Sequence, residues 1–279
     1  MIDENAFLED LYKAIDNKRL TLPTLPEVAL KVRDAVESES SSASQVAEMI
    51  ATDAALSARL LQVANSPLYR GRNPIDNLQL AVARLGTKLV RSLVVSLIMQ
   101  QIFQATNDLL DKRFRQTWEQ SVQIAAISRV LAQNLKHLDK EQALLAGLIH
   151  NIGALPVLTM AENYPELLED EAELDRVLDA LSPRVGQRIL KEWDFPESLV
   201  RVPANFLDLH YDGGNQADYV DVVIVGRLQT LMDQQHPVND LDWSRIPAFA
   251  KVGLEPEIQV IEIEGVAEDV AEIEHILIS

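Results

Sequence analysis

Apolar side chains recur at helical spacing along most of the chain and are separated by short polar stretches. A spacing of three to four residues is typical of amphipathic α-helices, so we expect successive helices joined by short loops. Pro23 and Pro26 interrupt this pattern, because each disfavours helical backbone in the residue before it. A second helix is expected over 27–37. The first helix has its apolar face at Phe7, Leu8, Leu11, Tyr12 and Ile15.

Local signals mark helix boundaries in the first half. Ser42 and Gln45 have the spacing of a capping box, which predicts a third helix through Ile50. Gly86 lies within the apolar stretch 75–103. Glycine disfavours a continuous helix, so the stretch is interpreted as two helices.

Similar signals mark the second half. Asp139 is placed to cap a helix over 140–150. Ser182 followed by Pro183 predicts a helix start, with a hydroxyl cap and proline at the first helical position. Weak alternation over 258–263 allows a short strand. Further helices are expected from about 108 to 135, after Pro196, over 218–233 and, as an acidic helix, over 266–278.

The composition agrees with an all-α chain and limits its chemistry. Of 279 residues, 47% are hydrophobic, mostly aliphatic, and none is cysteine. Disulfides, thiolate nucleophiles and Cys-ligated metals are therefore excluded. The acidic N-terminus lacks the order of a secretion signal, and the longest uncharged apolar run, 92–99, is too short to span a membrane. We therefore expect a cytoplasmic protein without a membrane partner.

Charge is distributed unevenly. The net charge is −18, and residues 252–279 contain eight acidic residues and no Lys or Arg. This balance disfavours a nucleic-acid partner, because affinity for phosphate backbones depends on clustered cations. With the polar pair Asn107-Asp108 as a boundary, we expect an N-terminal helical lobe (1–106), a second helical lobe (107–251) and an acidic C-terminal tail (252–279).

Several spaced motifs resemble one known family. They lie at 22–26, 50–61, 64–69 and 75–86 in the first half, and at 118–125, 146–153, 185–186, 193 and 196 in the second. Their order resembles the HDOD family, a branch of the HD phosphohydrolase superfamily, over roughly residues 20–230. The resemblance implies a multi-helical HD-like bundle with an N-terminal helical lobe, in which 107–251 is the HD-like part.

The superfamily resemblance also implies a metal site that can be checked residue by residue. Such a site takes a His from one helix, a His-Asp pair from a second and an Asp from a later one, and its metal activates a bound water. The matching positions are Gln120, His150-Asn151, Ser182 and Arg227. An amide is a poor ligand and a guanidinium repels a cation, whereas a hydrolytic site needs about three protein ligands. We therefore expect a vestigial site with no catalytic residue and no cofactor; any metal would be Fe, Mn or Zn.

Two histidines have alternative interpretations. His150 ends an apolar helix, so a buried, hydrogen-bonded structural His is favoured over residual ligand duty. Asn151 before Ile152-Gly153 fits the C-terminal end of a helix equally well. His210 is a displaced ligand candidate, although no Asp lies beside His150.

Arg84, Lys88 and Arg91 recur at helical spacing and are candidates to contact phosphate or an acidic partner. A solvated helix edge is the simpler interpretation, and Gly86 between the first two weakens the geometry.

The resemblance implies a non-catalytic signalling module. Its partner would be a sensor kinase, response regulator or cyclic-nucleotide protein acting in trans, because the HDOD-like region uses nearly the whole chain. Two alternatives stay open: a metal-dependent phosphohydrolase acting on a nucleotide or cyclic dinucleotide, and a pocket that binds a nucleotide without turnover.

Overall fold

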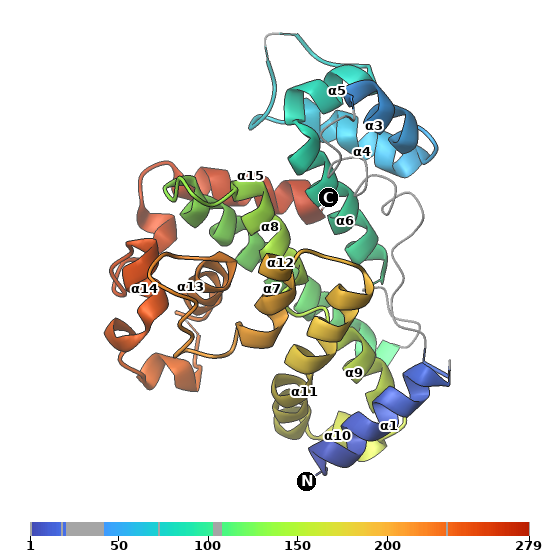
Figure 1. Ribbon diagram of the computed structural model, residues 1–279, viewed down its shortest axis with the longest axis vertical. Coiled ribbons are helices and arrows are strands. Elements are labelled where there is room, and N and C mark those ends of the chain that lie inside the picture. The colour runs from blue at the N-terminus through green and yellow to red at the C-terminus, as the bar shows by residue number, and fades with distance from the viewer. Residues whose placement is uncertain are drawn as a thin grey trace.

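The computed structural model describes residues 2–17, 19–20, 42–71, 73–102, 108–232 and 234–278 (Figure 1). Within these ranges the chain forms α-helices and short 3-10 turns, and no β-strand. The prediction of an all-α, multi-helical fold is confirmed. The helix expected over 27–37 lies outside the described residues, as does Asn107 of the predicted lobe boundary.

Figure 1 shows an elongated molecule with the helices in several layers. The α-helices are α1 (Glu4–Asp16), α3 (Ala43–Ile50), α4 (Ala54–Ala64), α5 (Leu78–Leu85), α6 (Thr87–Ile102), α7 (Asp108–Gln133), α8 (Lys140–Ile149), α9 (Ala154–Ala161), α10 (Pro165–Glu169), α11 (Glu171–Glu192), α12 (Glu197–Asn205), α13 (Tyr219–Leu231), α14 (Pro247–Val252) and α15 (Val266–Ile278). Three 3-10 turns follow α13: η1 (Pro237–Asp240), η2 (Trp243–Arg245) and η3 (Val260–Glu262).

The helices α3, α4 and α5 pack together at one end, and α6 leads from them into the rest of the molecule (Figure 1). The predicted capping box is present: the amide of Gln45 donates to Ser42 Oγ at 3.3 Å, and the amide of Ser42 donates to Gln45 Oε1 at 2.8 Å. Gly86 separates α5 from α6 with a φ of 81°, a backbone conformation that favours glycine. Both local predictions are confirmed.

Helix α7 is the centre of the second half, because α8, α13 and α15 all pack on it. The approach of α7 and α8 is very close. A Cβ on Gly147 would overlap the backbone of Ala125, so only glycine fits at that position. The buried pair Arg129–Glu141 joins the same two helices, with Arg129 Nη2 2.9 Å from Glu141 Oε1.

The stretch Lys140–Ala161, which spans α8 and α9, is long and apolar enough to cross a membrane by length and composition. The expectation that 92–99 is the longest uncharged apolar run is therefore wrong. In the structure 83% of its most apolar window is buried among other helices, so core packing accounts for its hydropathy.

The helix start predicted at Ser182-Pro183 is wrong. Helix α11 runs without a break from Glu171 to Glu192 and contains Pro183. Its cap is Asp170, which accepts a hydrogen bond from the amide of Glu173 at 3.1 Å. Proline removes one backbone donor from a helix interior, a local cost that packing can offset. Burial of Leu181, Val185 and Ile189 on one face supplies that packing.

The strand considered for 258–263 does not form; that segment contains η3 instead. Its backbone bonds to a side chain and not to a neighbouring strand. Gln229 Nε2 donates to the carbonyl of Ile258 at 3.1 Å, and the amide of Val260 donates to Gln229 Oε1 at 2.8 Å. Because the Gln229 side chain satisfies both backbone groups, the segment does not need hydrogen bonds to a neighbouring strand.

Helix α15 forms as predicted and packs on α6 and α7. The buried Arg59 of α4 donates to the carbonyl of Ile276, across 217 positions of sequence. The last helix is thereby joined to one of the first. Its buried face consists of Val270, Ile273, Ile276 and Leu277.

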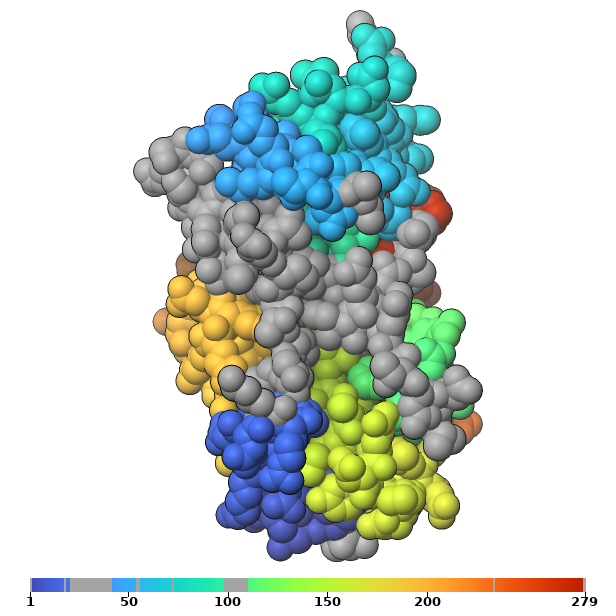
Figure 2. Space-filling view, turned by 90° about the vertical axis from the view of Figure 1, so that its right-hand side faces the viewer, coloured from blue at the N-terminus to red at the C-terminus, as the bar shows by residue number. Residues whose placement is uncertain are grey.

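Helix α1 docks at the opposite end of the molecule. Figure 2 shows it against the segment that contains α9 and α10, and the rings of Phe7 and Tyr164 are 5.0 Å apart. Arg176 of α11 forms ion pairs with Glu4 and with Glu173. The N-terminal helix is therefore held by segments from the second half of the chain.

Candidate functional site

His150 follows directly on α8, at its C-terminal end, and only 3% of the residue is exposed. Its Nδ1 lies 2.7 Å from the carbonyl oxygen of Gly147, so Nδ1 carries the proton and donates. The ring meets Phe206 edge-to-face, with centroids 4.8 Å apart. Burial is the main cause that lowers the pKa of His150 from 6.5 to about 4; the hydrogen bond to Gly147 opposes this shift, and the positive charge of Arg227 adds to it. The imidazole is therefore neutral at pH 7.

Arg227 lies on α13, next to Gly226, and is partly buried. Burial lowers its pKa, and the negative charge of Asp179 on α11 opposes that effect. A guanidinium stays protonated at neutral pH even so. The fixed positive charge of Arg227 therefore acts on the His150 imidazole and disfavours its protonation.

The turn after α8, which contains Asn151, touches α11 at Ser182. A Cβ on Gly153 would overlap the carbonyl oxygen of Ser182 and lie 2.5 Å from the amide of Gly186, so the two backbones are in direct contact. Asn151 Oδ1 and Ser182 Oγ are both buried without a hydrogen-bond partner. The structure therefore brings two of the predicted positions to one buried junction.

Gln120, the other predicted position, is exposed on the surface of α7, whereas His150 is buried. His210 is also exposed, on the loop between α12 and α13. Across the described ranges no group of three His, Asp or Glu side chains could hold a metal ion. Together with the positive charge of Arg227 acting on His150, this means that the residues present there do not fit the superfamily's metal.

The three basic candidates do not share one open surface. Arg84 donates to the carbonyls of Ala64 and Asn73, at 3.2 Å each. Lys88 pairs with Asp139 at 2.6 Å. Arg91 is buried, with its guanidinium 5.4 Å from the centre of the Phe195 ring. Each side chain therefore has a role within the fold, and contact with phosphate or a partner stays a prediction.

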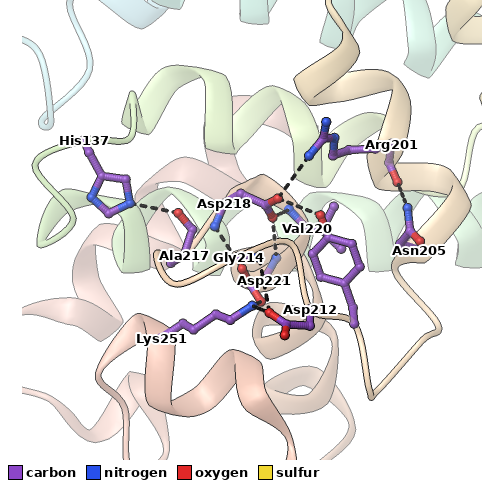
Figure 3. Close-up of polar contacts among 11 residues, drawn as sticks. His137, Arg201, Asn205, Asp212, Gly214, Ala217, Asp218, Val220, Asp221 and Lys251 are labelled. Carbon is purple, nitrogen blue, oxygen red and sulfur yellow. Dashed lines mark hydrogen bonds and ion pairs between the residues drawn. The ribbon is translucent and has the colours of Figure 1, made fainter.

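Figure 3 shows a polar cluster that the sequence analysis missed. Asp221 on α13 has no exposed surface, and Lys251 of α14 lies 3.4 Å from it and 3.2 Å from Asp212. Tyr211 donates to Asp218 at 2.7 Å, so the loop before α13 is held at both ends. The one available signal was the cap spacing of Asp218 and Asp221, which form a capping box.

His150 gives the folded state a pH dependence with a defined sign. Above pH 6.5 the imidazole is neutral in both states and contributes no slope. Below pH 6.5 the unfolded chain binds a proton at His150, whereas the folded protein does not bind one until about pH 4. The free energy of unfolding therefore decreases as the pH is lowered from 6.5 to 4. The difference between the unfolded pKa of 6.5 and the folded pKa of about 4 corresponds to a loss of about 3 kcal/mol in the free energy of unfolding.

Urea unfolding at pH values between 7 and 4 measures this loss, with His150→Asn as the matched variant. The Asn amide can donate to Gly147 as Nδ1 does but does not titrate. We expect a flatter pH profile for the variant by about 3 kcal/mol. Parallel profiles would show that other groups cause the acid sensitivity.

Comparison with known proteins supplies a family. The model of the HDOD domain matches residues 22–206. A solved structure from Shewanella amazonensis SB2B, named as a candidate metal-dependent phosphohydrolase, is 32% identical, with a TM-score of 0.81 over 98% of this chain and 99% of that one. An HDOD domain protein of unknown function from Geobacter sulfurreducens is 20% identical, with a TM-score of 0.68 over 99% and 100% of the two chains.

Two further similarities concern longer proteins. A candidate signal transduction protein from Marinobacter aquaeolei VT8 is 17% identical, with a TM-score of 0.69 over 99% of this chain and 66% of that one. An uncharacterized protein from Treponema pallidum (strain Nichols) is 28% identical over 196 residues, which are 64% of this chain. The matched region is 36% of that curated relative, so the chain spans about a third of its length.

Proposed function

This chain belongs to the HDOD family, and from that premise we propose that it is a non-catalytic regulatory module of signal transduction. In this role the helical framework of a phosphohydrolase presents binding surfaces to another protein. The partner would be a signalling protein in trans: a sensor kinase, a response regulator or a cyclic-nucleotide protein.

One observation carries the proposal: in the described part of the chain no three His, Asp or Glu side chains are grouped so that they could hold a metal, and His150 is the single ligand candidate that the sequence retains. The positive charge of Arg227 acts on that same imidazole. A hydrolytic metal at this position would experience the fixed positive charge of Arg227. Of these two residues, only His150 could bind it, through one neutral imidazole nitrogen. Charge repulsion and too few ligands both oppose such binding. Exposed Gln120 and uncharged Asn151 add no carboxylate or imidazole.

The alternative of a metal-dependent phosphohydrolase is favoured by the name of the 32% identical Shewanella protein. Elemental analysis of protein purified without a metal-affinity tag separates the two functions. The same sample is assayed for phosphodiester hydrolysis with added manganese. We expect well under about 0.1 equivalent of Fe, Mn or Zn and no turnover, because at least three ligands are needed.

The matched positive control is the double variant Asn151→Asp/Arg227→Asp. It adds two carboxylates at the positions that match the superfamily's ligands and removes the repelling charge, so we expect it to bind Mn²⁺ or Zn²⁺ more tightly than the native chain. About one equivalent of metal in the native protein, with turnover lost in His150→Ala, would overturn the proposal and establish the hydrolase.

A nucleotide pocket without turnover has a support of its own, the buried and unpartnered Asn151 Oδ1 and Ser182 Oγ. Nucleotides can be tested on the metal-free sample by thermal shift, since a ligand that binds only the folded state raises the melting temperature. A rise without hydrolysis would support this function in place of a purely protein-binding one.

A further inference from the structure

Most of the large apolar side chains that are exposed in the described part of the chain lie close together in sequence. They are Leu241, 52% exposed, and Ile258, Ile261 and Ile263, which are 41–47% exposed; the other is Leu80. Single exposed hydrophobic residues are ordinary, but a contiguous group suggests an interaction site. We call residues 241–244 together with 255–264 the Trp243 surface.

The backbone holds the isoleucines outward. Val260 points inward and is 1% exposed, while Gln229 of α13 binds two backbone groups of the segment, the carbonyl of Ile258 and the amide of Val260. The exposed side chains therefore belong to an ordered segment, which runs along the edge of the molecule between α14 and α15 (Figure 1). A preformed apolar surface binds a partner without the entropy cost of ordering it.

A cavity of about 370 Å³ adjoins this segment. Trp243 is a rigid part of its lining, because the indole donates to the carbonyl of Val238 at 2.8 Å and stacks on Phe249 at 5.7 Å. That volume is enough for one or two large side chains of a partner. The lining residues are Met232, Asn239, Leu241, Asp242, Trp243, Ser244, Pro256 and Glu257.

Charge identifies the occupant. Acidic residues alternate with the exposed isoleucines, and residues 252–279 contain no Lys or Arg. The exposed acids at this surface are Asp242, Glu255, Glu257, Glu262 and Glu264. An acidic surface repels nucleic acid and anionic lipid, but complements a segment in which Lys or Arg alternates with apolar residues.

We propose that the Trp243 surface docks a basic amphipathic segment of a partner protein, with one apolar side chain in the cavity and its cations beside the glutamates. This inference rests on the proposed function and deepens it by naming the surface and the chemistry of the partner. Hot spots of such interfaces are apolar anchors in pockets, surrounded by polar contacts.

The test uses the whole protein and two synthetic peptides of equal length, one alternating Lys with Leu and the other Glu with Leu. Fluorescence anisotropy of the labelled peptides measures binding. We expect the Lys peptide to bind and the Glu peptide not to. Ile258→Ser/Ile261→Ser and Glu257→Lys/Glu262→Lys should each weaken the Lys peptide about tenfold or more, as loss of interface anchors does.

The matched control is Glu166→Lys/Glu169→Lys on α10, which makes the same change in net charge at exposed positions elsewhere. It should weaken binding by less than about threefold, since distant exposed charges are screened. Equal weakening by both charge variants, or none by the isoleucine variant, would overturn the proposal and indicate non-specific attraction. Circular dichroism checks that each variant stays folded.

The two proposals can fail separately. Peptide binding that maps to the Trp243 surface in a protein that hydrolyses phosphodiesters would overturn the non-catalytic function and leave the docking surface in place. A metal-free, inactive protein that binds neither peptide would leave the regulatory function and overturn the surface.

Discussion

Gly153→Ala is expected to lower the melting temperature by about 10 °C, or to prevent folding altogether. The new Cβ would overlap the carbonyl oxygen of Ser182 and approach the amide of Gly186. Both are backbone atoms of α11, so no side-chain rotation relieves the clash. Overpacking a core usually costs about 1–3 kcal/mol, and a clash with backbone belongs at or above the upper end. For a chain of this size each kcal/mol corresponds to about 2–4 °C.

Gly265→Ala is the matched control, because its Cβ would meet nothing within 4 Å. It carries only the strain of a φ of 80°, about 1–2 kcal/mol. Differential scanning calorimetry measures the melting temperatures of the two variants, and so compares the cost of the backbone clash at Gly153 with the cost of backbone strain at Gly265. A Gly153 variant no less stable than the Gly265 variant would show that α9 and α11 are not in backbone contact.

Arg129→Met is expected to lower the free energy of unfolding by about 3–5 kcal/mol, the usual cost of breaking a buried ion pair. The Arg129 side chain is 3% exposed and holds Glu141 with two nitrogens, at 2.9 and 3.3 Å. It also donates to Tyr69 Oη at 2.9 Å, and so links the N-terminal helices to α7 and α8. Removing it leaves the Glu141 carboxylate buried without its cation.

The double variant Arg129→Met/Glu141→Leu tests this explanation. Replacing both partners of a buried pair by apolar residues is often neutral, so the double variant should regain much of the stability lost in the single one. Urea denaturation gives both values. Additive losses would mean that packing of the Arg129 stem, and not the stranded charge, is responsible.

Helices with local signals could be predicted from sequence. Ser42 and Gln45 cap α3 as expected, and Gly86 divides α5 from α6, because the residues that decide these boundaries are adjacent to them. Pro183 shows the limit of the same rule. Its local preference for a helix start is overridden by burial of the α11 face, which depends on segments far away in sequence.

The residues of the candidate site were also only partly predictable from the sequence. His150, Asn151 and Arg227 could be singled out by the order of the motifs, but the action of the Arg227 charge on His150, across 77 positions of sequence, depends on the packed fold. The pair Lys251–Asp221 carried no sequence signal, because a lysine in an ordinary helical pattern gives no indication that it neutralises a buried carboxylate. Gln120 was predicted by alignment alone, and the structure places it in solvent.

The contact between Arg59 and Ile276 has a consequence for synthesis on the ribosome. Translation proceeds at about 5–20 residues per second, so α4 waits roughly 10–40 s for the helix that covers its neighbours. During that delay the apolar faces of α6 and α7 that α15 will bury are without their native cover. Closing so long a loop also slows folding, because its entropy is lost before the contact forms. We therefore expect the nascent chain to expose these faces until α15 has been synthesised.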